Sequence, residues 1–180
     1  MRALVVAGAP CVFDDARAAL ACGGFDAYYV VNGAAMHWPL ADWWVTWHPE
    51  AVPRWRRERE AGGWPIPPII SSPHPTRPKE PVSRWIEARW PEQPKMMLTS
   101  TYLAVKAALE DGAERVVICG APLDVAGGNA DPDLPQDHDY RRYRPAFAWA
   151  ADHVFAGRVR AASGYLADLL GAPDREWMAC

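Results

Sequence analysis

Short apolar segments alternate along the chain with longer segments in which apolar residues recur at helical spacing. The apolar segments are rich in β-branched and aromatic residues and lie next to Gly, Pro, Asn or Ser, a pattern that predicts strands. They cover residues 2–7, 26–31, 42–47, 68–72, 115–119 and 157–163. Because successive rather than alternate positions are apolar, these runs are typical of parallel strands that are buried on both faces.

Helices are expected between and after these strands, at residues 14–21, 49–61, 101–111, 140–155 and 164–171. Asp14 or Asp15 is a suitable cap for the first of them, and Ser100 or Thr101 for the third. Pro145 is expected to kink the helix over residues 140–155. Regular alternation of strands and helices predicts an α/β fold with a Rossmann-like wound, mainly parallel sheet flanked by helices.

The length of 180 residues favours one domain over residues 1–180. Prolines interrupt residues 73–95, which are therefore expected to form a long surface excursion with at most a short helix at 82–89. This excursion is the main departure from the regular strand–helix pattern.

Composition excludes several classes of protein. The net charge of −3 gives no reason to expect non-specific nucleic-acid binding, which needs many cations. The four cysteines lack zinc-type spacing, so a reduced, cytoplasmic protein without a structural metal is expected. No apolar run approaches the roughly 20 residues that span a bilayer, and the first ten residues are interpreted as a strand rather than a signal peptide.

Motifs for common enzyme classes are missing from the sequence. There is no Walker A lysine after a glycine loop, no G-x-G-x-x-G and no G-x-S-x-G. The sequence therefore argues against P-loop kinases, standard dinucleotide enzymes and Ser-His-Asp hydrolases, and no cofactor is predicted with certainty.

Polar and small residues follow most of the predicted strands. Since the ligands of open parallel sheets lie beyond the carboxyl ends of the strands, these positions are the candidate site. They are residues 8–11, 32–33, 46–50, 71–72 and 120–124, together with the start of the helix at Ser100, whose free N–H groups suit an anion. Any one of these loops could be an ordinary strand end, and only their joint polarity indicates a ligand.

Two histidines are candidates for proton transfer. His48 lies at a strand end beside Glu50, and His138 lies between two aspartates before the run YRRYR. Either could be a general base, and either could equally be a solvated loop residue. The aspartates at 131, 133, 137 and 139 could hold a divalent metal or simply be solvated.

Aromatic and basic residues leave a similar choice. The tryptophans clustered between residues 38 and 64 could stack on a sugar or base, or could cover the sheet. Arginines at 141, 142 and 144 could bind phosphate or form a solvated helix face. Exposed tryptophans would also be compatible with a homo-oligomer.

Four stretches together resemble a known family. They are VVAGAPCVFDD, YYVVNGAA, DWWVTWHPE and TSTYLAVKAALEDGAERVVICGAPLD. In this order they are similar to segments of the bacterial sialyltransferase-like superfamily, which includes 6-hydroxymethylpterin diphosphokinase-like proteins. The late DHDYRRYRPAFAW…GRVRAASG is similar to small phage and prophage proteins of that group.

This resemblance implies a nucleotide, typically cytidine monophosphate carrying a sugar, bound across the strand ends. It also implies roles for individual residues. The loop of Gly8 and Pro10 and the helix start would contact phosphate, and Asn32 would contact the nucleotide. Gly120 and Asp124 would line the far side of the pocket. Tyrosines would contact the leaving phosphate. The residues concerned are Gly8, Pro10, Asn32, Thr99, Ser100, Thr101, Gly120 and Asp124, with Tyr140 and Tyr143 for the leaving phosphate and His48 or His138 as base.

The sequence departs from the family pattern at two loops. GAPC stands where the family prefers Gly-Asn-Gly-Pro-Ser, and TST lacks the glycine of TSG. Three functions therefore stay open: a glycosyltransferase-like enzyme that uses a nucleotide sugar, a pterin-diphosphokinase-like enzyme that needs ATP and magnesium, and a catalytically inactive, phage-type nucleotide-binding or assembly protein.

Overall fold

A computed structural model describes residues 1–73, 82–124 and 138–179. They form a seven-stranded sheet in the order β5-β4-β3-β2-β1-β6-β7, and every neighbouring pair is parallel. The strands are β1 (Arg2–Val6), β2 (Ala27–Val31), β3 (Trp43–Val45), β4 (Ile69–Ser71), β5 (Arg84–Trp85), β6 (Arg115–Cys119) and β7 (Val159–Ala161). The predicted α/β, Rossmann-like wound sheet is confirmed.

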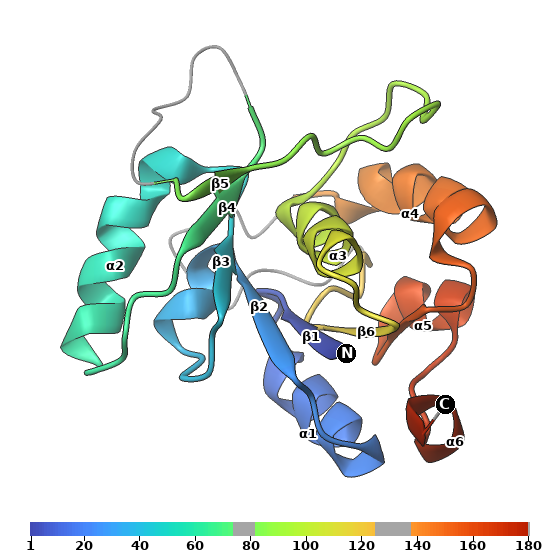
Figure 1. Cartoon of the computed structure of the whole chain (residues 1–180), viewed down its shortest axis with the longest axis horizontal. Helices are drawn as coiled ribbons and strands as arrows, with labels where there is room; N and C mark the ends of the chain where they lie inside the picture. Colours follow the sequence, from blue (N-terminus) through green and yellow to red (C-terminus); the bar gives the residue numbers. More distant parts are fainter. Residues whose placement is uncertain (74–81, 125–137, 180) are drawn as a thin grey trace.

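Helices cover both faces of this sheet (Figure 1). The helices are α1 (Val12–Cys22), α2 (Val52–Ala61), α3 (Ser100–Glu110), α4 (Arg144–Ala150), α5 (Gly164–Leu170) and α6 (Arg175–Ala179). Short helical turns are η1 (Asn32–Met36), η2 (Pro49–Ala51), η3 (Tyr140–Tyr143) and the π-type η4 (Ala151–Phe155). Apolar residues of α1, α2 and α6 pack on one face, and those of α3, α4 and α5 pack on the other.

Alternate residues of the central strand divide between these two cores. Ala3 and Val5 belong to the cluster with α3, whereas Leu4 and Val6 belong to the cluster with α1. A strand buried on both faces has no polar side, which is why its sequence reads as a continuous apolar run.

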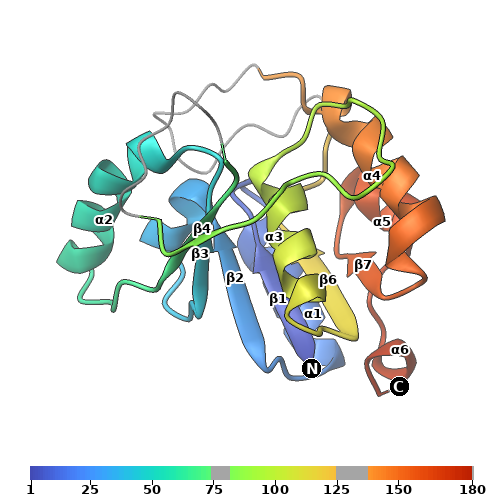
Figure 2. The same cartoon turned by 45° about the horizontal axis from the view of Figure 1, so that its top comes forward.

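Strand order reverses between β1 and β6. Strands β2 to β5 extend from one side of β1, while β6 and β7 lie on its other side (Figure 2). The β1–β6 ladder pairs Val6 with Cys119 and continues past both strands, since Ala9 N–H donates to the carbonyl of Gly120 over 2.9 Å. The loops after β1 and β6 therefore lie side by side at the carboxyl edge, the usual place for a ligand in this fold.

A fully buried arginine fixes α2 to the chain after η1. Arg59 donates hydrogen bonds to four backbone carbonyls, those of Ala35, Trp38, Pro39 and Pro65, over 2.6–3.0 Å. Within the described residues no carboxylate pairs with it, and burial lowers the pKa of its guanidinium. The arginine thus joins α2 to η1 through Ala35 and to chain without regular secondary structure through Trp38, Pro39 and Pro65.

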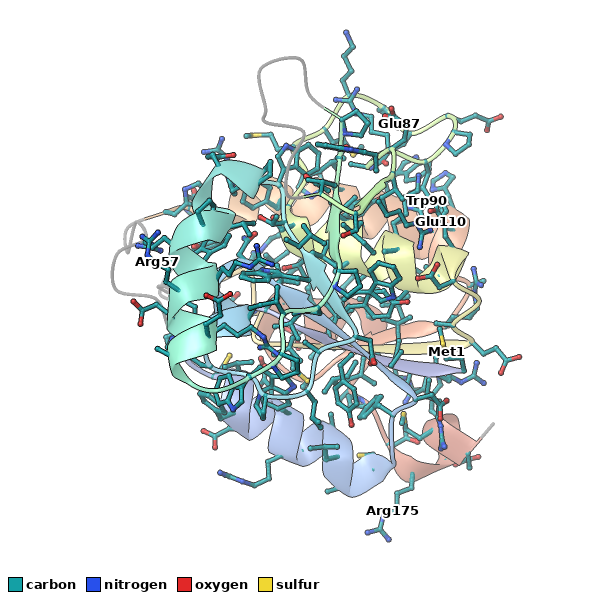
Figure 3. The ribbon with its side chains drawn as sticks, turned by 60° about the vertical axis from the view of Figure 1, so that its left-hand side comes forward. Met1, Arg57, Glu87, Trp90, Glu110 and Arg175 are labelled. Carbon is teal, nitrogen blue, oxygen red and sulfur yellow. The ribbon has the colours of Figure 1, made fainter. Side chains whose placement is uncertain are left out.

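The helix predicted at residues 82–89 is wrong. Ser83 N–H donates to the carbonyl of Ile69 and Ile86 N–H to that of Ser71, so this segment pairs with β4 as an edge strand. Further on, Lys106 of α3 donates to the carbonyl of Arg89 over 2.7 Å and lies 4.7 Å from the ring of Trp90. Figure 3 labels Trp90 and Glu110 where the segment after β5 passes α3.

Three smaller expectations about helix ends are also corrected. Helix α1 begins after Cys11 without a side-chain cap, and the Asp15 carboxylate is used elsewhere. Thr99, not Ser100 or Thr101, caps α3 by accepting from the N–H of Tyr102. Pro145 lies in the first turn of α4, where proline is tolerated, so it begins an α-helix after η3 rather than kinking one.

Two further expectations concern the described part of the chain as a whole. None of its helices has the length and apolar character needed to span a membrane. Cys11, Cys22 and Cys119, the cysteines it contains, are all free thiols.

Candidate functional site

A pocket of about 520 Å³ opens at the carboxyl edge of the sheet. Its volume lies within the range of typical small-molecule sites. The loops after β1, β2, β3 and β6, the start of α3 and η3 all contribute to its walls. Among the lining residues are Gly8, Asn32, His48, Thr99, Ser100, Thr101, Gly120, Asp124, His138, Tyr140 and Tyr143.

Eleven of the twelve residues given site roles in the sequence analysis line this one pocket. Pro10 is the exception, because its side chain is exposed at the start of α1 and does not line the pocket. Among the other strand-end positions, Ser71 at the end of β4 and Ser72 after it are buried and do not line the pocket. Cys11, Thr46 and Pro49 do not line it either. The topology explains the convergence, since parallel strands all end at the same edge.

Asn32 is held in an orientation that presents a donor. Its backbone has a φ of +49°, a left-handed conformation that Asn tolerates better than most residues. The N–H of His48 donates to the hydroxyl of buried Thr46, and that hydroxyl donates to Asn32 Oδ1 over 2.8 Å. Because Oδ1 is occupied, the Asn32 NH₂ group is left as the donor for a ligand.

The start of α3 is joined to the loop after β3. Ser100 Oγ accepts from the N–H of Trp47 over 2.9 Å, and Ser100 is almost fully buried. Thr99 Oγ1 satisfies the N–H of Tyr102, which leaves the N–H groups of Ser100 and Thr101 without an acceptor inside the helix. These two N–H groups and the helix dipole create a positive potential at the pocket wall.

The two candidate histidines have different partners. His48 Nδ1 lies 3.1 Å from Glu50 Oε1, and both side chains are more than half exposed. His138 Nε2 lies 2.9 Å from the hydroxyl of Tyr143, and its ring contacts Tyr140 edge-on. When Nδ1 of His48 donates to Glu50, its Nε2 is the nitrogen that can accept a proton from a ligand.

Asp124 is paired rather than free. Its Oδ1 accepts from Arg144 over 2.6 Å, and the same guanidinium donates to the carbonyl of Leu123 and lies over the ring of Tyr165. Asp139 is likewise engaged by Arg141 through two side-chain bonds, which lower the pKa of Asp139. These two acids are therefore poorly placed to hold a metal.

The other acids proposed as metal ligands, at residues 131, 133 and 137, lie outside the described residues. Within the described ranges, no three His, Cys, Asp or Glu side chains come together as a metal site. Arg142 has no carboxylate partner among these residues and lies over the ring of Tyr143.

Asp15 does not line the pocket but holds Gly120 of its wall through a hydrogen bond, a role that the sequence analysis did not predict. The carboxylate is 6% exposed, and its Oδ2 accepts from Gly120 N–H over 2.8 Å and from Ser163 Oγ over 2.7 Å. Cys11 Sγ is a third donor at 3.4 Å. Burial, together with the nearby Asp15 charge, raises the pKa of the Cys11 thiol, which therefore keeps its proton.

We expect Asp15→Asn to lower the free energy of unfolding by about 2 kcal/mol, because the charge-assisted hydrogen bonds that Oδ2 accepts would become weaker bonds to a neutral amide oxygen. Urea denaturation measures the loss, and exchange of the Gly120 amide proton should quicken. Asp14→Asn is the matched control, since Asp14 is 82% exposed and its carboxylate pairs with Arg17 at the surface. Equal stabilities of the two variants would contradict this role.

Other lining residues carried little signal in the sequence. Glu50 was noticeable because of its neighbour His48, but His37 had nothing to distinguish it from the other histidines. Trp47 and Trp55 line the pocket, whereas Trp44 is fully buried in the core. Burial of Trp44 and Trp55 fits the interpretation that these tryptophans cover the sheet, and stacking on a sugar or base stays a prediction.

Comparisons of this chain with protein-family models, curated proteins and solved structures gave no match. The resemblance to the sialyltransferase-like superfamily thus stays a prediction from its motifs.

Proposed function

We propose that this pocket binds a nucleotide sugar and that the chain is a glycosyltransferase-like enzyme that displaces the nucleotide from the sugar. The observation that carries the proposal is the convergence of four separate strand-end loops and one helix start on a single pocket of ligand size. The resemblance of the same segments to glycosyltransferase motifs adds the reaction class.

The phosphate would bind at the start of α3. The free N–H groups of Ser100 and Thr101 suit an anion, and the Asn32 NH₂ group offers a further donor from the neighbouring wall. Gly8 and Gly120 leave these walls without side chains. Within the described residues, no Lys or Arg lines the pocket. The negative charge of the phosphate would therefore be stabilised by neutral N–H and O–H donors and by histidines.

His48 is the better placed of the two histidines to act as general base. Glu50 would orient its ring and stabilise the imidazolium that forms, as carboxylates do for catalytic histidines. In the reaction, an acceptor hydroxyl would give its proton to His48 Nε2 while its oxygen bonds to the anomeric carbon. The bond from that carbon to the phosphate oxygen would break, and the nucleotide would leave with the electron pair.

Tyr140 and Tyr143 would contact the leaving phosphate. The hydroxyls of Tyr140 and Tyr143 are potential donors, and His138 shares a hydrogen bond with Tyr143. Donors aimed at developing charge stabilise the transition state more than the bound substrate.

Calorimetry with cytidine and uridine nucleotides tests the binding step. We expect one of these nucleotides to bind with a dissociation constant below 1 mM, roughly 4 kcal/mol of binding free energy. Absence of measurable heat for every nucleotide at millimolar concentration would reject the proposal.

His48→Ala tests the chemical step once a donor is found. We expect kcat to fall about a hundredfold, since general-base catalysis typically contributes that much or more, while the nucleotide still binds. Glu50→Gln should cause a smaller decrease. His153→Ala is the control, because His153 hydrogen-bonds the carbonyl of Trp149 and does not line the pocket. Unchanged kcat in His48→Ala would remove this residue as the base.

A nucleotide-binding protein without catalysis is the second candidate. The lack of Lys and Arg among the described lining residues and the altered GAPC and TST loops favour it, because little positive charge is available to stabilise a leaving phosphate. Tight nucleotide binding without turnover of any nucleotide sugar would support this alternative. The pterin-diphosphokinase alternative is less favoured, since Asp124 and Asp139 are both paired with arginines.

A further inference from the structure

The ends of β2 and β3 bring Asn32 next to Thr46. The two strands are parallel, and Val31 of β2 pairs with Val45 of β3, so the residues that follow these two lie side by side. Thr46 N–H donates to the carbonyl of Ile70 over 3.0 Å, which continues the ladder between β3 and β4. Thr46 is therefore fixed by the sheet itself, and it supports the pocket without lining it.

Two side chains from the β3 segment hold Asn32. Trp44 and Thr46 are two residues apart in extended chain, so their side chains lie on the same face. Trp44 Nε1 donates to the main-chain carbonyl of Asn32 over 3.0 Å, and Thr46 Oγ1 donates to Asn32 Oδ1 over 2.8 Å. Both donors belong to residues that are 0% exposed. The left-handed backbone of Asn32 and its amide are thus each held by a separate side chain.

The Thr46 hydroxyl favours one orientation of the Asn32 amide. A threonine hydroxyl has a single hydrogen. Its oxygen accepts from the N–H of His48 over 2.8 Å, and within the described residues its hydrogen has one acceptor, Asn32 Oδ1. Turning the amide over would place NH₂ against this hydroxyl and leave a buried O–H without an acceptor, which is unfavourable. The amide oxygen therefore points to Thr46 and the NH₂ group points away from it.

The Asn32 NH₂ group is accessible from the pocket. Asn32 lines the pocket, and its Nδ2 has no acceptor among the described residues. Unlike the unpaired Nε1 atoms of Trp38 and Trp90, it is not enclosed by protein, so a ligand can reach it. An NH₂ group donates hydrogen bonds and does not accept them. This part of the wall therefore favours a ligand oxygen that accepts and disfavours a ligand group that donates.

We propose that Thr46 is a positioning residue that determines specificity through Asn32, so that the wall selects an acceptor oxygen of a phosphate group. Thr46 does not touch the ligand, and Asn32 makes the contact. The phosphate as ligand group rests on the proposed function, whereas the orientation of the amide does not. With valine at position 46 the amide would turn freely, and ordering it on binding would weaken phosphate affinity roughly fivefold.

Nuclear magnetic resonance of the ligand-free protein tests the positioning. Asn32→Asp removes the side-chain NH₂ signals of Asn32 from the ¹⁵N spectrum and so assigns them. In the wild type and in Thr46→Ser, which keeps the hydroxyl, the ¹H–¹⁵N NOE of this NH₂ group should be as high as that of the backbone. In Thr46→Val it should fall clearly below. A low NOE in the wild type, or an equal NOE in all three proteins, would overturn the proposal.

Titration with inorganic pyrophosphate, which offers only acceptor oxygens, tests the selection. The Asn32 NH₂ signals should shift saturably in the wild type and in Thr46→Ser, with dissociation constants within about threefold, and Thr46→Val should bind roughly fivefold more weakly. Asn32→Asp keeps the acceptor for Thr46 but replaces the NH₂ group with a charged oxygen. Followed through the Ser100 and Thr101 amide signals, its affinity should fall about fiftyfold. Unchanged affinity in Asn32→Asp would overturn the proposal.

The outcomes separate this inference from the proposed function. If pyrophosphate gives the expected order of variants but no cytidine or uridine nucleotide binds, the proposed function fails and the role of Thr46 stands. If a nucleotide binds equally to the wild type, Thr46→Val and Asn32→Asp, Thr46 has no such role and the proposed function stands.

Discussion

Replacing Arg59 by methionine should lower the free energy of unfolding by about 4 kcal/mol, one of the larger effects expected of a single substitution here. Methionine can fill much of the space but cannot donate. Four carbonyls that now accept from the guanidinium would lose this partner, and the bond to Ala35 is fully buried while the other three are partly buried. The chain from Ala35 to Pro39, which includes His37 of the pocket wall, would lose its hydrogen bonds to Arg59 of α2.

Arg56→Met is the matched control on the same helix. Arg56 is 47% exposed and pairs with Glu60 over 3.5 Å, so its loss should change stability by no more than about 0.5 kcal/mol. Urea denaturation of both variants gives the comparison. A similar small effect in both would show that the four carbonyls find other partners and that Arg59 is not the attachment point.

Gly120→Ala should lower the free energy of unfolding by about 3 kcal/mol and also weaken binding in the pocket. Gly120 has a φ of +70°, which an L side chain rarely adopts. A Cβ there would lie 2.7 Å from Cβ of Val12 and 2.9 Å from the carbonyl oxygen of Ala7. Neither contact involves the end of a flexible side chain, so the loop after β6 would have to move.

Gly63→Ala separates backbone strain from this steric clash. Gly63 has a similar φ of +75°, but nothing lies within 4 Å of a Cβ added there. Its substitution should cost about 1 kcal/mol, the left-handed penalty alone. If thermal or urea unfolding shows equal losses for the two variants, packing against Val12 and Ala7 does not restrict the loop.

Much of the fold was predictable because the strands are buried on both faces. Residues 115–119 were predicted with their observed bounds, since the apolar run of a strand buried on both faces is uninterrupted and ends at Gly120. The pocket followed from the fold class, because parallel strands end at one edge. Edge strand β5 was not predictable, since it is two residues long and lies among prolines.

Contacts between distant segments account for the other omissions. Asp15 looked like a helix cap, and nothing in its local sequence shows that it accepts from Gly120, 105 positions away. Arg59 is one of several arginines in α2, but its spacing from Val52 and Trp55, both buried, places it on the inner face. That periodicity was the available signal, and the charge of the residue obscured it.

The hydrogen bond from Trp47 N–H to Ser100 Oγ has a consequence for how a ligand would be received. It ties the turn that precedes His48 to the first residue of α3. Under the proposed function, the proton acceptor and the anion-binding N–H groups would then be preorganised as one rigid unit before the ligand arrives. Their spacing would not have to be established during turnover, which spares the enzyme part of the entropy of aligning its reactants.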